Sequence, residues 1–157
     1  MPDNWKQRLD ITLIDIDPHA LEFCQQHLTG ALAEHQVETV RTNLARFPRT
    51  KSLRQTLGKS RLVYCAGFFD YLDETAAVEM LRALWSHVDD SGQLLVFNFS
   101  ENNPSRAYME WVGNWYLTYR TESSFKSLME QANLDRCEYE IGTGSELVNL
   151  VLSCHRV

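Results

Sequence analysis

The stretch Ile11-Thr12-Leu13-Ile14-Asp15-Ile16-Asp17-Pro18 decides the fold class, because it joins a buried strand directly to a helix. Residues 11–16 are β-branched and almost continuously apolar, which is typical of a parallel strand that is buried on both faces. Asp17 is suited to cap a helix, and Pro18 then occupies the first helical position. Apolar residues recur at helical spacing over 21–28. We therefore predict a strand that is followed at once by a helix.

The same alternation of strand and helix continues along the chain. We predict further strands over 37–42, 61–65 and 93–99, a turn over 89–92, a short helix around Leu53 and Leu57, and helices that follow 73, 103 and 121. A hairpin of 137–141 and 147–154 ends the chain. Strands that alternate with helices imply a mostly parallel sheet with helices on both faces. The predicted fold class is α/β, Rossmann-like, with a C-terminal antiparallel hairpin.

Length and charge exclude several classes of protein. The 157 residues suit one domain, spanning 1–157, and the net charge of −6 argues against nucleic acid and anionic membranes as partners. No apolar run is long enough to span a bilayer. The four cysteines include no C-x-x-C pair, so we expect no metal site. We interpret them as reduced, mostly buried thiols of a cytoplasmic protein.

Candidate ligand-binding residues follow three of the predicted strands. Ligands of open parallel sheets bind outside the carboxyl ends of the strands. Asp15 could accept hydrogen bonds from a ribose diol, although capping of the helix alone would explain an acidic residue here. Asn43 could pair with an adenine edge or serve as a turn residue. Gly67 would let a ligand approach the backbone, and Phe68 and Phe69 are either core residues or walls of the site.

These segments together resemble one known family. Residues 13–21, 42–44, 64–72 and 91–96 look like the seven-stranded S-adenosylmethionine-dependent methyltransferases, and the terminal hairpin fits that family as well. The resemblance implies S-adenosylmethionine as the cofactor. It implies that Asp15 holds the ribose hydroxyls, that Ile16 contacts adenine, and that Asn43, with Leu44 beside it, faces the adenine amino group. It places Ala66 and Gly67 near the methionine part of the cofactor.

A narrower resemblance concerns the acceptor. Residues 66–72 and 102–111 are similar to a bacterial subgroup that is linked to methyl ester formation on 3-hydroxy fatty acids. A small-molecule acceptor with a carboxylate would need a donor to orient it, and Arg106 and Arg120 are the catalytic candidates because guanidinium holds carboxylates bidentately. A pocket for its apolar part is predicted from Phe69, Tyr108, Trp111, Trp115 and Tyr119. Core packing of an added helix is the alternative interpretation of this aromatic set.

One feature of the family is missing. The Gly-rich turn and the strand before it should precede Ile11, but only ten residues lie there and none is glycine. The G-x-G of Gly142 and Gly144 lies in the terminal hairpin. The chain is therefore a fragment of a longer domain, or completes its sheet with a second copy or another chain, or is a degenerate module; the sequence favours an N-terminally incomplete domain. We expect an exposed apolar seam between the first and third strands, or its closure by rearrangement or dimerisation.

Three functions compete at this stage. The first is methyl transfer to a small-molecule acceptor, such as the carboxylate of a hydroxy fatty acid. The second is a non-catalytic binding or regulatory module with the same fold, which the missing Gly-rich turn supports. The third is a nicotinamide-dependent oxidoreductase, which would also need a Gly-rich turn and which the terminal hairpin disfavours.

Overall fold

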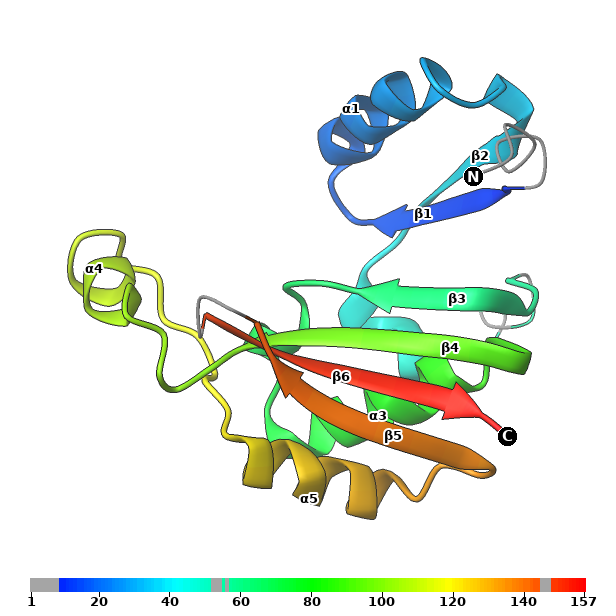
Figure 1. The fold of residues 1–157 in the computed structure, drawn as a ribbon. Helices are drawn as coiled ribbons and strands as arrows, with labels where there is room; N and C mark the ends of the chain where they lie inside the picture. Colours follow the sequence, from blue (N-terminus) through cyan, green and yellow to red (C-terminus); the bar gives the residue numbers. More distant parts are fainter. Residues whose placement is uncertain (1–8, 52–54, 56, 145–147) are drawn as a thin grey trace. The chain divides into compact units, whose positions relative to one another are not determined.

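The computed structural model describes residues 9–51, 55, 57–144 and 148–157. The chain divides into two compact units, residues 1–49 and residues 50–157 (Figure 1). The single domain over 1–157 that the sequence suggests stays a prediction. The short helix predicted around Leu53 lies outside the described residues.

The first unit is a strand, a helix and a second strand. β1 (Ile11–Asp15) pairs in parallel with β2 (Val37–Arg41), and α1 (Pro18–Thr29) connects them together with a 3₁₀ turn, η2 (Glu34–Gln36). The carboxylate of Asp17 accepts a hydrogen bond from the His19 N–H at 2.9 Å and caps α1. The predicted strand-to-helix junction is confirmed, because a side-chain cap and a proline act together at the start of α1.

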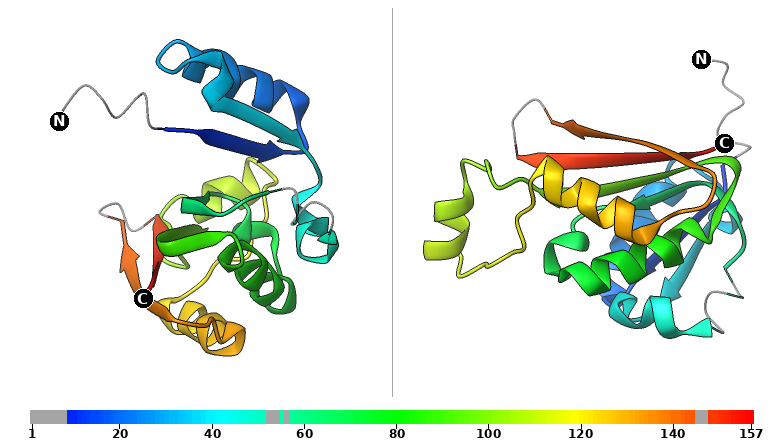
Figure 2. Two further views of the ribbon diagram at one scale, coloured as in Figure 1. Left: turned by 90° about the vertical axis from the view of Figure 1, so that its right-hand side faces the viewer. Right: turned by 90° about the horizontal axis from the view of Figure 1, so that it is seen from below.

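The second unit is built on a four-stranded sheet. Its strand order is β3-β4-β6-β5, formed by β3 (Ser60–Cys65), β4 (Val88–Phe99), β6 (Asn149–Arg156) and β5 (Cys137–Thr143). β3 and β4 are parallel, whereas β4–β6 and β6–β5 are antiparallel, which confirms the predicted closing hairpin. α3 (Glu74–Trp85) and α5 (Glu122–Ala132) lie side by side on one face of this sheet (Figure 2).

Local signals in the sequence set the limits of these two helices. The carboxylate of Asp73 accepts the Ala76 N–H at 2.8 Å and caps α3. Thr121 and Ser124 form a reciprocal capping box at the start of α5, and Asn133 ends that helix in the left-handed conformation. Between the helices and the sheet lies a core whose fully buried members include Met80, Leu81, Leu94, Val96, Phe125, Leu128 and Leu152.

The turn predicted over 89–92 is instead part of β4. The strand begins at Val88, and its pairing with β3 shifts between Ser60 and Leu62, so the extra residues form a bulge. A Cβ at Gly92 would lie 2.8 Å from the Asp89 carbonyl oxygen, which explains the glycine. A bulge and a turn use the same residue types, and the pairing of β4 with its neighbours decided between them.

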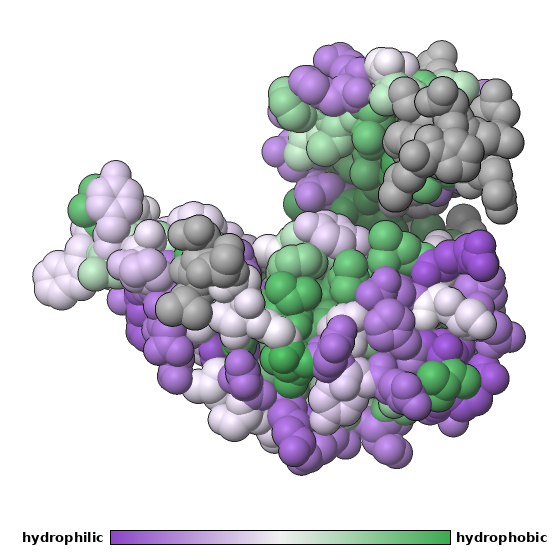
Figure 3. Space-filling view, viewed as in Figure 1, coloured by the Kyte–Doolittle hydropathy of each residue, from purple (hydrophilic) through white to green (hydrophobic). Residues whose placement is uncertain are grey.

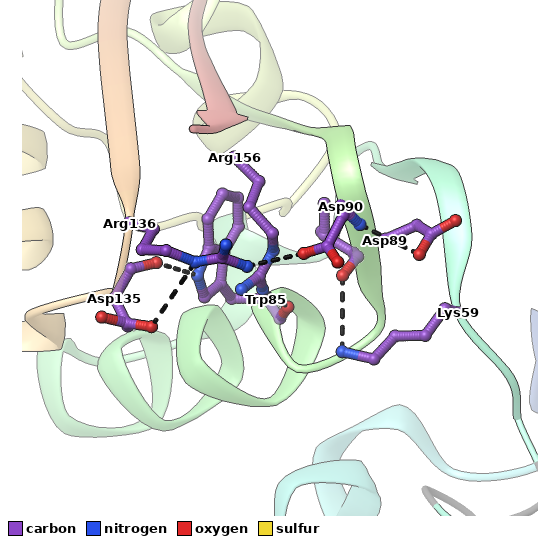
Figure 4. A network of polar contacts seen from close by, with 8 residues as sticks. Lys59, Trp85, Asp89, Asp90, Asp135, Arg136 and Arg156 are labelled. Carbon is purple, nitrogen blue, oxygen red and sulfur yellow. Dashed lines mark hydrogen bonds and ion pairs between the residues drawn. The ribbon is translucent and has the colours of Figure 1, made fainter.

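Polar contacts link this bulge to the start of β5, and link the end of β6 to α3 (Figure 4). Arg136 donates to the Asp90 carboxylate at 2.6 Å, and Lys59 donates to the Val88 carbonyl at 3.4 Å. Arg156 donates to the Trp85 carbonyl at 2.8 Å, with its guanidinium carbon 4.4 Å from the centre of the Trp85 ring. These contacts lie at the end of the sheet where β3 and β4 begin.

β3 presents an open edge within the described part of the chain. It is hydrogen bonded to β4 alone, and β1 in the other unit is hydrogen bonded to β2 alone. Leu62 and Tyr64 on β3 are 54% and 60% exposed. An exposed apolar strand of this kind agrees with one side of the predicted seam, and the seam between the first and third strands stays a prediction.

Candidate functional site

The first unit brings the predicted nucleoside-binding residues to one edge of its strand pair. Asp15 ends β1 and faces Arg41 in the register of β2, and the Thr42 N–H donates to the Asp15 carbonyl at 2.8 Å. Asp15 and Ile16 therefore lie beside Asn43 and Leu44, where β1 and β2 end. Ile16 is 56% exposed, so an apolar side chain is presented to the solvent at this edge.

The polar groups of this edge also have local roles. One carboxylate oxygen of Asp15 accepts the Asp17 N–H at 2.9 Å, and the amide oxygen of Asn43 accepts the Ala45 N–H at 3.0 Å. The second bond starts η3 (Leu44–Arg49), where Leu44 is half-buried. A carboxylate has two oxygens and about four acceptor positions, so the bond to Asp17 leaves Asp15 able to accept from a ligand diol.

In the second unit, the loop after β3 has open space beside its glycine. Gly67 adopts a φ of +72°, and a Cβ built there would meet nothing within 4 Å. Ala66 beside it is exposed. Phe69 is fully buried and begins the 3₁₀ turn η4 (Phe69–Tyr71), so its ring belongs to the core. Of the two interpretations that the sequence left open for Phe69, its burial supports the core.

The sequence predicts that Arg120 is accessible to an acceptor. In the structure Arg120 is buried instead, with 4% of its surface exposed. Its guanidinium donates to the carbonyls of Phe69 at 2.8 Å and Leu72 at 2.7 Å, and to the side-chain oxygen of Asn98. Its own N–H donates to the Phe99 carbonyl at 3.0 Å. The arginine therefore ties the loop after β3 to the end of β4.

Asp70 shares this buried position and is 2% exposed. Its carboxylate accepts the Phe99 N–H at 2.6 Å, and its carbonyl accepts the Thr118 N–H at 2.7 Å. Burial raises the pKa of Asp70, and the Phe99 N–H and the charge of Arg120 oppose that rise only in part. Burial disfavours the charged form of Arg120 as well, and for a cation this lowers the pKa. We call Asp70, Asn98 and Arg120 the buried polar cluster.

Arg106 lies on α4 (Arg106–Trp111) and is the more accessible arginine, with a half-exposed side chain. Its Nε donates to the Glu110 carboxylate at 2.8 Å, and its guanidinium carbon is 4.5 Å from the centre of the Tyr119 ring. A guanidinium that pairs through one nitrogen and stacks on an aromatic ring keeps further N–H donors. Arg106 therefore has the chemistry that a carboxylate acceptor requires.

The hydroxyl of Tyr119 is buried and has no hydrogen-bond partner among the described residues. Burial raises the pKa of Tyr119, and the carboxylate of Glu110 adds to the rise. A buried hydroxyl without a partner costs free energy, and such groups in folded proteins commonly meet a water or a ligand. The Tyr119 hydroxyl beside Arg106 is therefore a second candidate contact for an acceptor oxygen.

The remaining aromatic residues fall into two sets. The Trp115 indole donates to the Tyr71 hydroxyl at 3.0 Å, and its ring meets Phe99 edge-on at 6.2 Å, so Trp115 lines the same end of the sheet as Tyr119. Tyr108 and Trp111 are 68% and 87% exposed on α4. The helix predicted after 103 is α4, which ends at Trp111 and does not include Trp115. The aromatic residues predicted to line one pocket therefore lie in different surroundings.

Sequence reasoning missed Asp70 and Asn98 as members of this site. A signal was present for Asn98, because it interrupts the apolar run Leu94–Phe99 of a strand that is buried on one face. A polar residue in such a position needs a buried partner. The partner itself could not be predicted, because Arg120 is 22 residues away along the chain.

The cysteines differ from expectation, because of the four only Cys154 is buried, while Cys24 is exposed. Burial nevertheless raises the pKa of the half-buried Cys65 to about 12, which makes this thiol a poor nucleophile at neutral pH. Within the residues that the structure describes, no cluster of side chains could hold a metal ion. In the same residues, each helix is too short or too polar to cross a bilayer.

No protein-family model and no curated protein matches the sequence. Solved structures do match. Magnesium protoporphyrin IX methyltransferase from Synechocystis, with S-adenosylhomocysteine bound, superposes on 94% of this chain with a TM-score of 0.65 and 17% identity. The fold is that of the S-adenosylmethionine-dependent methyltransferases.

Two further structures agree. An O-methyltransferase family protein from Burkholderia thailandensis matches 96% of the chain with a TM-score of 0.64 and 17% identity. Human N-acetylserotonin methyltransferase matches 94% with a TM-score of 0.61 and 14% identity. The chain spans 64%, 44% and 40% of the lengths of these three proteins, in the order given. At these identities the likeness concerns the fold, and function must be argued from the residues.

Proposed function

We propose that this chain is the cofactor-binding and acceptor-binding part of an S-adenosylmethionine-dependent methyltransferase that acts on a small carboxylic acid. The observation that carries the proposal is the position of Asp15. It ends a parallel strand in the first unit, directly beside the end of the neighbouring strand, within a fold shared with methyltransferases. A carboxylate in this position is the usual partner of a ribose diol.

The residues present fit the nucleoside half of the cofactor. Asp15 would accept from the ribose hydroxyls, exposed Ile16 would contact the adenine face, and Asn43 and Leu44 would lie at the edge of the base. In the second unit, the backbone at Gly67 has open space beside it, which suits the role that the resemblance gives to Ala66 and Gly67. When bound, the cofactor supplies an activated methyl group on a sulfonium.

The chain's own residues would orient the acceptor. A carboxylate is already ionised at neutral pH, so it needs a positioned donor and no general base. Arg106 offers N–H donors at the surface, and the Tyr119 hydroxyl lies beside it. Trp115 would exclude water from the apolar part of the acceptor. Arg120, held by the chain's own carbonyls, would act by holding the loop around Ala66 and Gly67. A 3-hydroxy fatty acid is the proposed acceptor class, which rests on the resemblance of 66–72 and 102–111.

The proposal includes completion of the sheet by one more strand, contributed by a preceding segment of a longer domain or by a second copy. The open edge of β3 and the exposed Leu62 and Tyr64 support it. Parallel strands are rarely left with an exposed apolar edge, because such an edge can pair with another chain.

Calorimetric titration of the whole chain with S-adenosylhomocysteine tests the proposal. We expect saturable binding that Asp15→Ala weakens about 10- to 100-fold, because a charged acceptor for two hydroxyls is lost. Asp15→Asn keeps an oxygen for the Asp17 N–H, so weaker binding by this variant would reflect loss of charge and not loss of the turn.

Glu38→Ala is the matched control, since Glu38 is an exposed acidic residue on β2. Binding that Glu38→Ala reduces as strongly as Asp15→Ala would show general electrostatic attraction. Absence of binding at millimolar ligand would reject cofactor binding by this chain. It would favour either a chain that binds the cofactor only when its sheet is completed or a non-catalytic module with the methyltransferase fold. The second candidate is supported by the lack of a Gly-rich turn after any strand of the sequence.

A further inference from the structure

The helix α4 buries Met109 but exposes its other large apolar side chains. Tyr108, Trp111 and Val112 share one face at spacings of three and four residues, and they are 68%, 87% and 68% exposed. Arg106 and Glu110 lie on the opposite face, where Arg106 stacks on Tyr119 and Glu110 is largely covered. A helix on a globular protein ordinarily buries its apolar face and exposes its charges.

The exposed residues continue beyond the helix and form a defined surface. We call Tyr108, Trp111, Val112 and Tyr116, which is 67% exposed, the outer face of α4. Within the second unit, α4 stands away from the sheet in both figures that show it (Figures 1 and 2). In the space-filling view this part carries pale and green surface with little of the purple that marks hydrophilic residues (Figure 3).

The chemistry of the outer face is that of an interfacial anchor. Tryptophan and tyrosine combine an apolar ring with a polar N–H or O–H, and they are enriched where proteins meet the headgroup region of a bilayer. The charges of α4 pair with each other, since Arg106 bonds to Glu110 at 2.8 Å. The face therefore has neither the lysines nor the arginines that anionic lipids attract.

Its size argues against a stable dimer built on this face alone. A fully exposed aromatic side chain can bury about 150–250 Å². Tyr108, Trp111 and Tyr116 are 68%, 87% and 67% exposed, so together they offer about 330–560 Å². A standard interface buries about 800 Å² on each partner. A bilayer sets no such minimum area, because the strength of interfacial binding increases with the apolar area that is buried.

We propose that the outer face of α4 inserts into a neutral, zwitterionic lipid surface and holds the protein there reversibly. The surface would be recognised by its apolar interior and dipolar headgroups. The net charge of −6 makes anionic lipid an unfavourable partner. The proposal stands on the exposure and composition of α4, and does not depend on whether the chain transfers methyl groups.

The test uses the whole chain and large vesicles of phosphatidylcholine. Binding is measured by co-sedimentation, and Trp111→Ala is compared with the unchanged chain. We expect binding that Trp111→Ala weakens about tenfold or more, because the apolar area of one tryptophan is lost. Trp111→Phe should recover much of it. Trp111 is 87% exposed, so its replacement should leave the fold intact, which circular dichroism checks.

Phe23→Ala is the matched control, because Phe23 is an aromatic residue that is 61% exposed on α1 of the other unit. It should bind vesicles as well as the unchanged chain does. Addition of phosphatidylserine should weaken binding. The proposal is overturned if the chain does not bind, if Trp111→Ala binds as tightly as the original, or if phosphatidylserine is required. It is also overturned if the chain self-associates without binding vesicles and Trp111→Ala abolishes the self-association. In that case a second copy of the chain is the partner of this face.

Discussion

Arg106 and Arg120 are fourteen positions apart and have opposite surroundings. Arg120 is 4% exposed, and three oxygens of the chain accept from its guanidinium. Arg106 is half-exposed, with one carboxylate partner on its own helix and a tyrosine ring beneath it. Buried Arg120 holds the loop after β3 to the end of β4, whereas Arg106 is available to a ligand. Two arginines that look equivalent in the sequence therefore have a buried, structural position and an accessible position.

Loss of Arg120 should give the largest effect. Arg120→Met leaves three acceptor oxygens without their donor and Asp70 without the opposite charge. We expect the free energy of unfolding to fall by about 3–5 kcal/mol, as for other buried pairs that lose one partner. Urea unfolding followed by circular dichroism measures it. A loss below 1 kcal/mol would mean that water replaces the arginine and that the cluster is not buried in solution.

Hydrogen exchange should separate the same two regions without any mutation. The Phe99 N–H donates to the buried Asp70 carboxylate at 2.6 Å, and the Arg120 N–H donates to the Phe99 carbonyl. α4 is a six-residue helix with one exposed face, so its amides open locally. We expect them to exchange about a hundredfold faster than those of Phe99 and Arg120. Equal protection, read by mass spectrometry of peptides, would contradict a locally mobile α4.

The stability of the buried polar cluster should depend on pH through Asp70. Burial raises the pKa of Asp70 in the folded state above its unfolded value, so the folded chain binds the proton more tightly. The contribution of Asp70 is therefore complete below pH 3.8 and is lost as the pH rises through the folded pKa.

Asp70→Asn isolates this dependence, because asparagine can still accept the Phe99 N–H. The difference in unfolding free energy between the unchanged chain and Asp70→Asn should fall as the pH rises, by at most about 1.4 kcal/mol per pH unit. Urea titrations at several pH values between 3.5 and 7.5 measure it. A difference that grows with pH would show that the charge of Arg120 outweighs burial.

Loss of Arg106 should give the smallest effect on stability. Arg106→Met removes a half-exposed ion pair and a ring contact, together worth about 0.5–1.5 kcal/mol. The same urea experiment measures it, and Arg120→Met serves as the comparison. If Arg106→Met destabilised the chain as much as Arg120→Met, the distinction between an accessible and a structural arginine would fail.

The elements of this fold could be predicted from the sequence because their signals are local. Asp17 with Pro18, Asp73, and Thr121 with Ser124 start helices through hydrogen bonds that span two or three residues. Apolar runs with the strand period marked the ladders, and the hairpin brought its own turn residues. The sequence predicts a turn over 89–92, where the structure has a bulge. Only the pairing with the neighbouring strand distinguishes the two.

The candidate residues at the strand ends were also predictable, since a parallel sheet places its ligands there. The proximity of Asp15 and Asn43 was predictable because the strands that they follow are consecutive in the chain. What only the tertiary structure decided is which polar and aromatic side chains are covered. Asp70, Asn98 and Arg120 meet across 22 to 50 residues, and burial sets the pKa of Asp70 and commits Arg120 to the interior. Exposure likewise separates Trp111 from Trp115, because packing is a property of contacts between distant segments and local sequence does not encode it.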